Sequence, residues 1–174
     1  MVNMNIILIG FKNSGKTTIG KMIAHTLNYQ FIDTDTLLEK YYFREKGLLL
    51  PVHKIQHQEG DVKFRQLEKD AIHTLTNVKK TVIATGGGSI LNKDNVNFFK
   101  KIGKLIYLYV PKNILSERTL QGRLPTFIDP KNPEKSFEKM FDERKDIYEN
   151  IADYQVEAFD KTNDEIVDEI VKLI

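Results

Sequence analysis

The stretch MNIILIGFKNSGKTTIG, residues 4–20, decides the fold. Its apolar part, 4–9, is a short run rich in isoleucine, which is typical of a strand buried on both faces of a parallel sheet. Glycines follow at positions 10 and 15, and Lys16 and Thr17 complete the spacing G-x-x-x-x-G-K-T. This spacing between an apolar strand and an amphipathic helix predicts a phosphate-binding loop, or P-loop.

The chemistry of such a loop explains its spacing. Glycines let backbone N–H groups turn toward phosphate oxygens, and the helix that begins near Gly15 adds its positive dipole end. We expect Lys16 to reach the β- and γ-phosphates of ATP and the Thr17 hydroxyl to coordinate Mg²⁺. The alternative is a plain glycine turn before a core helix. The predicted ATP-binding residues of the loop are Asn13, Ser14, Gly15, Lys16, Thr17 and Thr18.

The rest of the chain alternates between strand-like and helix-like patterns. Short β-rich runs at 31–32, 81–84 and 104–110 read as further strands, and apolar residues spaced by three and four follow them. This alternation predicts an α/β fold with a parallel sheet and helices on both faces. We expect Pro111 in the first turn of a helix over 113–118, and a last helix through Ile166 and Ile174.

Two lysine pairs and one proline-rich segment stand out from these patterns. Lys79-Lys80 and Lys100-Lys101 each end an apolar pattern, where cations favour a helix C-terminus. Residues 120–134 carry Gly122 and three prolines between two helical patterns. Composition alone leaves two interpretations of this segment open, a mobile flap and an ordinary surface loop.

Composition limits the possible classes of protein. The 174 residues fit one domain, and the chain has no cysteine and therefore no disulfide or thiol nucleophile. The formal net charge is +2 and acids and bases are interspersed, so nucleic acid is not an expected partner. The apolar N-terminal run is too short for a signal peptide or a membrane span, so we expect a cytoplasmic protein without membrane contact.

A P-loop protein normally has a second carboxylate for Mg²⁺ at the end of a strand. The run 81–84 ends in Thr-Gly-Gly-Gly and supplies no acid, whereas Asp33 and Asp35 follow the run 31–32. In an extended segment these side chains share one face at the carboxyl edge of the sheet, where ligands bind. Asp33 is then expected near the Mg²⁺ water shell, and Asp35 near an acceptor hydroxyl. The alternative is a helix N-cap.

Glycines and arginines supply the remaining candidates. Residues 86–88 are three glycines, which permit close backbone approach to a ligand, although a plain tight turn is the alternative. The planar guanidinium groups of Arg65 and Arg144 suit a carboxylate, which favours an acidic substrate. Each arginine has nearby acids, among them Glu68 and Glu143, so surface ion pairs are the alternative there.

Taken in order, these motifs resemble the shikimate kinase family over nearly the whole chain. They are the P-loop, Asp33-Thr34-Asp35, the stretch 59–68, Ala84-Thr85-Gly86-Gly87-Gly88, and Arg144…Tyr148…Ala152-Asp153. The resemblance implies a single domain, 1–174, with a three-layer P-loop kinase fold and a five-stranded parallel sheet of order 2-3-1-4-5. It also implies a shikimate-binding region at 35–76 and a mobile lid at 119–134. The implied reaction is transfer of the γ-phosphate of ATP to the 3-hydroxyl of shikimate, in aromatic amino acid biosynthesis.

The resemblance also implies roles for single residues. Asp35 would bind the acceptor hydroxyls, with Asp33 toward Mg²⁺, most simply through water. The shikimate carboxylate would be bound by Arg65 and Arg144, and Gly87 would touch shikimate through its backbone. In the lid, Arg123 would reach the phosphates, while Arg118 would flank the adenine of ATP. The predicted catalytic residues are Lys16, Asp35 and Arg123.

The chain departs from the family pattern at three places. The lid reads Arg123-Leu124-Pro125-Thr126-Phe127 where the family usually has Arg-Pro-Leu-Leu, and the Gly-Glu pair of the family is Gly60-Asp61 here. The segment 41–51 is slightly long. Two other functions remain as alternatives: a related small-molecule kinase such as a gluconate kinase, and a nucleotide-binding regulatory module without catalysis. The resemblance implies a monomer.

Overall fold

The computed structural model describes residues 4–121, 124–125 and 128–174. A five-stranded sheet lies at its centre, with strand order β2-β3-β1-β4-β5 and every neighbouring pair parallel. This is the predicted order. The strands are β1 (Asn5–Ile9), β2 (Gln30–Asp33), β3 (Thr81–Ala84), β4 (Gly103–Tyr109) and β5 (Tyr154–Glu157).

Three of the four strands predicted from short runs are buried, whereas all four residues of β2 are partly or fully exposed. Every residue of β1 and β3 is buried, and so is the centre of β4, 105–108. The strand that the runs did not predict is β5, where Val156 is the one buried residue. Its polar pattern is that of an edge strand, which the sequence does not distinguish from a loop. Asp153 fixes its start, because the Asp153 carboxylate accepts a 2.9 Å hydrogen bond from the backbone of Leu105 in β4.

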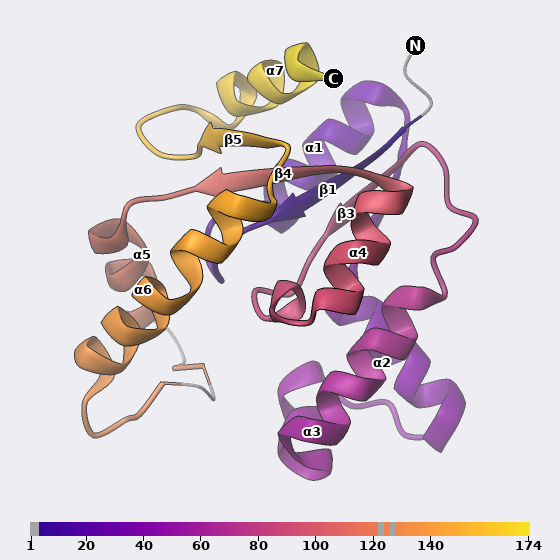
Figure 1. The fold of residues 1–174 in the computed structure, drawn as a ribbon, viewed down its shortest axis with the longest axis vertical. Coiled ribbons are helices and arrows are strands. Elements are labelled where there is room, and N and C mark those ends of the chain that lie inside the picture. The colour runs from indigo at the N-terminus through magenta and orange to yellow at the C-terminus, as the bar shows by residue number, and fades with distance from the viewer. Residues whose placement is uncertain (1–3, 122–123, 126–127) are drawn as a thin grey trace.

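Helices cover both faces of the sheet, which completes three layers (Figure 1). On one side α1 packs against α7, and on the other side α4 and α6 contact β4. The helices α2 and α3 pack against each other around a separate apolar cluster that contains Leu38, Tyr42 and Phe64. The bounds are α1 (Lys16–Leu27), α2 (Thr34–Lys46), α3 (Val52–His73), α4 (Lys93–Ile102), α5 (Lys112–Leu120), α6 (Pro133–Ile151) and α7 (Asn163–Leu173), with a short 3₁₀ helix, η1 (Ser89–Leu91).

Helix ends follow local capping chemistry with two corrections. Lys100 and Lys101 lie in the last turn of α4 as predicted, whereas Pro111 is the N-cap of α5, which begins at Lys112, and not a residue of its first turn. Lys79 and Lys80 do not end a helix, because α3 stops at His73 and they lead instead into β3. Gly60 breaks α3 with φ 75° and ψ 164°, which places the predicted turn before Arg65.

Among the residues that the structure describes, none of the helices has the length and apolar character needed to cross a membrane.

Candidate active site

The phosphate-binding loop connects β1 to α1 and depends on two glycine conformations. Gly10 has φ 146° and Gly15 has φ 92°, values that side-chain-bearing residues rarely adopt. Gly10 also has no space for a Cβ, which would lie 3.0 Å from the Leu108 carbonyl oxygen. Within the loop, the Ser14 N–H donates to the Phe11 carbonyl over 3.2 Å. The loop therefore returns sharply into α1, whose N-terminal N–H groups open toward the site.

Lys16 lies inside this loop. Its side chain is 7% exposed, and its Nζ donates to the Phe11 carbonyl oxygen over 2.6 Å and to Ser14 Oγ over 3.4 Å. Burial lowers the pKa of Lys16 to about 8, while the charges of Asp35 and Asp33 oppose that shift. A buried ammonium without a full counter-charge is well suited to bind phosphate oxygens.

Asp33 contacts both the phosphate-binding loop and α2. Its Oδ2 accepts a 2.8 Å hydrogen bond from Thr17 Oγ1, and its Oδ1 accepts a 3.0 Å hydrogen bond from the backbone N–H of Asp35. Asp33 is thus the N-cap of α2, as one interpretation expected, and it lies beside Thr17 at the same time, so capping leaves the expected role near Mg²⁺ open to it. The carboxylate and the hydroxyl form a pair of oxygen ligands of the kind that Mg²⁺ prefers.

Asp35 occupies the first turn of α2, so the expectation of an extended Asp33–Asp35 segment was wrong. The helix begins at Thr34 because Asp33 caps it. Burial, together with the negative charges of Asp33 and Glu68, raises the pKa of Asp35 to about 6 against the opposing charges of Lys16 and Lys12. A carboxyl group with a pKa near neutrality is suited to accept a proton from a hydroxyl.

Arg65 of α3 forms an ion pair with a buried acid, Glu68. Its Nη1 lies 2.8 Å from Glu68 Oε2, one turn along α3, and Glu68 is 4% exposed. The second oxygen, Glu68 Oε1, accepts a 2.8 Å hydrogen bond from Ser89 Oγ. The sequence suggested Glu68 only as a surface partner of Arg65. The pairing is present, but burial makes Glu68 part of the site, and its spacing of three from Arg65 was the available signal.

The glycine turn after β3, residues 86–88, contacts residues of both α2 and α3. The Gly86 N–H donates to Thr34 Oγ1 over 2.8 Å. A Cβ at Gly86 would lie 2.7 Å from Asp35 Oδ1, and one at Gly88 would lie 2.6 Å from Arg65 Nη2. The turn is therefore a close approach of backbone to two functional side chains, not a plain tight turn.

One cavity of about 510 Å³ joins these parts. Its lining includes Arg144 of α6, whose pKa is lowered mainly by burial and further by the charge of Arg65. Sequence reasoning missed His53 and Gln56 of α3, which also line it. The predicted site residues that line the cavity are Asn13, Gly15, Lys16, Thr17, Thr18, Asp33, Asp35, Arg65, Gly87 and Arg144.

Two of the predicted residues that the structure describes, Ser14 and Arg118, do not line the cavity. Ser14 is buried within the loop. Arg118 of α5 does not line the cavity, but its Nη1 donates to the Asn13 carbonyl over 3.3 Å, which keeps it beside the phosphate-binding loop. Arg123 lies outside the described residues. Of the predicted lid, Leu124 and Pro125 line the cavity.

The parallel sheet, the strand-loop-helix phosphate site and the carboxylates where β2 passes into α2 define a P-loop kinase. The shikimate kinase family matches residues 12–174, nearly the whole chain. The chain belongs to the shikimate kinase family.

Individual relatives agree with this assignment. Shikimate kinase from Caldanaerobacter subterraneus is 36% identical over 97% of this chain and 94% of its own length. A solved structure, shikimate kinase from Acinetobacter baumannii in complex with shikimate, is 31% identical and covers 99% of this chain and 93% of its own, with a TM-score of 0.87. A gluconokinase from Sinorhizobium meliloti has a TM-score of 0.63 at 20% identity over 98% of this chain and 90% of its own, a likeness of fold alone.

Proposed function

We propose that this chain transfers the γ-phosphate of ATP to the 3-hydroxyl of shikimate. The observation that carries the proposal is the pair Arg65 and Arg144, which line the same cavity as Lys16 and Asp35. Two guanidinium groups opposite a P-loop fit an acceptor that carries a carboxylate. Glu68 supports this fit, because its hydrogen bonds to Arg65 and Ser89 hold the Arg65 guanidinium beside the glycine turn.

In the proposed reaction, Asp35 accepts the proton of the acceptor hydroxyl. The hydroxyl oxygen forms a bond to the γ-phosphorus while the bond between that phosphorus and the bridging oxygen breaks, and ADP leaves. Lys16 neutralises charge on the phosphoryl oxygens in the transition state. Arg65 and Arg144 hold the carboxylate, which orients the 3-hydroxyl for in-line attack and removes much of the entropic cost of alignment.

Magnesium fits the oxygen pair of Thr17 and Asp33. Mg²⁺ usually keeps several waters and binds through one or two protein oxygens plus substrate phosphates, so two protein oxygens are sufficient. We propose that Thr17 binds the ion directly and that Asp33 binds it through water. The ion would supply charge neutralisation on the β- and γ-phosphates.

The segment 119–134 is proposed as the lid that closes over ATP. Leu124 and Pro125 line the cavity, so this segment forms part of its wall. Closure would exclude water and prevent loss of the phosphoryl group to hydrolysis. Arg123 is proposed to reach the phosphates and Arg118, which already contacts Asn13, to flank the adenine.

The decisive experiment measures ADP release with Mg·ATP and a set of acceptors: shikimate, gluconate and nucleoside monophosphates. We expect turnover with shikimate alone. Activity only with another acceptor would overturn the substrate assignment and keep the kinase. ATP binding without turnover for any acceptor would favour a regulatory module.

The carboxylate contact is tested by removing each side of it. Arg65→Ala should raise the KM for shikimate about 100-fold, the value expected when a charged hydrogen-bonded pair loses one partner. With the methyl ester of shikimate, which has no carboxylate charge, the same substitution should change KM much less. The matched control is Arg44→Ala, an exposed arginine of α2 that lies against the Tyr41 ring. Equal effects on acid and ester would remove Arg65 from carboxylate binding.

A further inference from the structure

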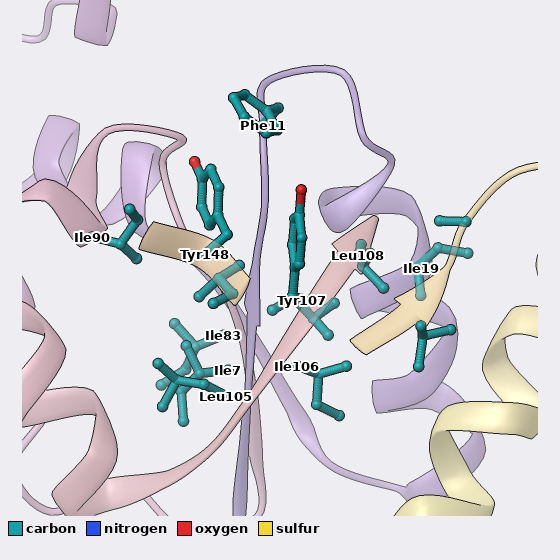
Figure 2. Close-up of a cluster of buried hydrophobic side chains, with 14 of the residues drawn as sticks. Ile7, Phe11, Ile19, Ile83, Ile90, Leu105, Ile106, Tyr107, Leu108 and Tyr148 are labelled. Atoms are coloured by element: carbon teal, nitrogen blue, oxygen red, sulfur yellow. The ribbon is translucent and has the colours of Figure 1, made fainter. Parts of the chain in front are cut away.

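Tyr148 of α6 has a ring held firmly by its neighbours. It is 0% exposed, it stacks on Tyr107 of β4 with centroids 5.1 Å apart and an interplanar angle of 11°, and it lies 4.8 Å from the ring of Phe11. Figure 2 shows the Tyr148 and Tyr107 rings side by side, with Phe11 of the phosphate-binding loop beyond them. Because packing fixes the ring, removal of the hydroxyl alone should leave the ring in place.

The hydroxyl of Tyr148 reaches two loops that bind different substrates in the proposed function. It lies 3.1 Å from the carbonyl oxygen of Gly10, which opens the phosphate-binding loop, and it also bonds to the carbonyl oxygen of Gly87 in the glycine turn. Burial raises the pKa of Tyr148 well above its usual value, so the hydroxyl keeps its proton at neutral pH. One donated proton thus serves two carbonyl acceptors.

The two loops also meet through their backbones. A Cβ at Gly87 would lie 3.1 Å from the Lys12 nitrogen and 3.6 Å from the Gly10 carbonyl oxygen. A side chain at position 87 would crowd the phosphate-binding loop, so the backbones of the two loops are in close contact at this point. The Tyr148 hydroxyl forms its two hydrogen bonds at this contact, one to each loop, and so controls how far apart the loops lie.

We propose that Tyr148 is a positioning residue that fixes the distance between the transferred phosphoryl group and the acceptor hydroxyl. It acts by holding the carbonyl oxygens of Gly10 and Gly87 at a fixed separation. The inference rests on the proposed kinase function. Phosphoryl transfer needs its reacting atoms about 3 Å apart and in line, and a shift of about 1 Å can cost about 100-fold in rate. A hydroxyl that is hydrogen-bonded to both loops is therefore expected to affect the rate of transfer more than the affinity for either substrate.

The first test is Tyr148→Phe, which keeps the ring stack and removes the bridge. We expect kcat to fall about 10- to 100-fold while the KM values for ATP and shikimate change less than about threefold. The fraction of ADP released without phosphorylated shikimate should rise, because a misplaced acceptor leaves the phosphoryl group to water. A loss of stability alone would lower transfer and hydrolysis together.

The matched control is Tyr107→Phe. Tyr107 belongs to the same ring stack, and its hydroxyl is buried with no hydrogen-bond partner among the residues that the structure describes. Removing that hydroxyl should leave kcat and the coupling of ADP release to transfer within about twofold of the original protein. Equal losses in both variants would assign the effect to packing and overturn the inference, as would an unchanged kcat in Tyr148→Phe.

Amide hydrogen exchange separates this inference from the proposed function, because it needs no substrate. Faster exchange over 10–16 and 86–89 in Tyr148→Phe, but not in Tyr107→Phe, would support the bridge even if shikimate proved not to be the acceptor. Unchanged exchange in both loops would contradict it. If Tyr148→Phe does not fold, 4-fluorophenylalanine at position 148 fills the space of the hydroxyl without donating a proton, and the same results are expected.

Discussion

The nucleotide side and the acceptor side of the cavity are built in different ways. On the nucleotide side, the phosphate-binding loop is one contiguous stretch, residues 10–18, and its shape comes from backbone conformations at Gly10 and Gly15. The acceptor side combines residues far apart in the chain, from Asp35 through Arg65 and Glu68 to Arg144. It depends on buried charges that act on one another. Changes on the nucleotide side should therefore affect every reaction, whereas changes on the acceptor side should depend on pH and on the acceptor.

The largest effect is expected on the nucleotide side, from Lys16→Met. Loss of a charge that stabilises a transferring phosphoryl group costs about 10³- to 10⁵-fold in kcat. The loss should be the same for shikimate transfer and for ATP hydrolysis without acceptor, both measured by ADP release. The control is Lys21→Met, an exposed lysine on the same helix, which should retain activity. A loss confined to shikimate transfer would contradict the division between the two sides.

On the acceptor side, Asp35→Asn should lower kcat by about 10²- to 10⁴-fold, the usual contribution of a general base. In the unmodified enzyme, kcat/KM should rise with pH through about 6 as Asp35 ionises, and fall above about 8 as Lys16 loses its proton. In Asp35→Asn the rise of kcat/KM near pH 6 should disappear, whereas the fall above about pH 8 should remain. Turnover near the original rate would remove Asp35 from the mechanism.

The same substitution should stabilise the protein. Native Asp35 keeps its proton up to about pH 6, whereas the unfolded chain releases it near 3.8, so the native state binds more protons between these values. Stability therefore falls as pH rises through this window, and above it the buried carboxylate costs up to about 3 kcal/mol. Asp35→Asn should raise the free energy of unfolding by about 1–3 kcal/mol at pH 8 and by less at pH 5, measured with urea. An equal gain at both pH values would contradict this cause.

Gly88→Ala should act on the acceptor alone. The backbone at Gly88, φ −101° and ψ −8°, accepts alanine, but the new Cβ would displace the Arg65 guanidinium. We expect the KM for shikimate to rise about tenfold, the equivalent of about 1.4 kcal/mol, with the KM for ATP unchanged. In an Arg65→Ala background the same change should have no further effect. An additive effect would show that Gly88 acts by another route.

The smallest effect is expected from Ser89→Ala. It removes the 2.8 Å hydrogen bond to the buried Glu68, and an oxygen left unpaired there should cost about 1–2 kcal/mol in the free energy of unfolding. The shikimate KM should change about threefold or less, because the Arg65 ion pair remains. The control is Ser136→Ala, where an exposed hydrogen bond is lost and the change should stay within about 0.5 kcal/mol. Equal changes in the free energy of unfolding in Ser89→Ala and Ser136→Ala would mean that the hydrogen bond from Ser89 to Glu68 contributes no more than an exposed one.

Much of the fold followed from local patterns in the chain. Four strands were predicted from short runs of strand-forming residues, and the phosphate-binding loop from its spacing, because both signals lie within a few neighbouring residues. β5 was not visible in the same way, since Gln155 and Glu157 flank Val156 and leave no apolar run. It was expected only from the resemblance to the family, together with the strand order that the structure confirms.

The sequence by itself determined the class of the protein, since a contiguous loop needs only its own backbone to bind phosphate. Only the tertiary structure decided which acids are buried and what they touch. The pKa of Asp35, the burial of Glu68 and the bridge made by Tyr148 arise where α2, α3, α6 and the glycine turn converge. Burial and electrostatic interaction depend on distances in space between segments far apart in the chain, and a linear pattern does not contain those distances.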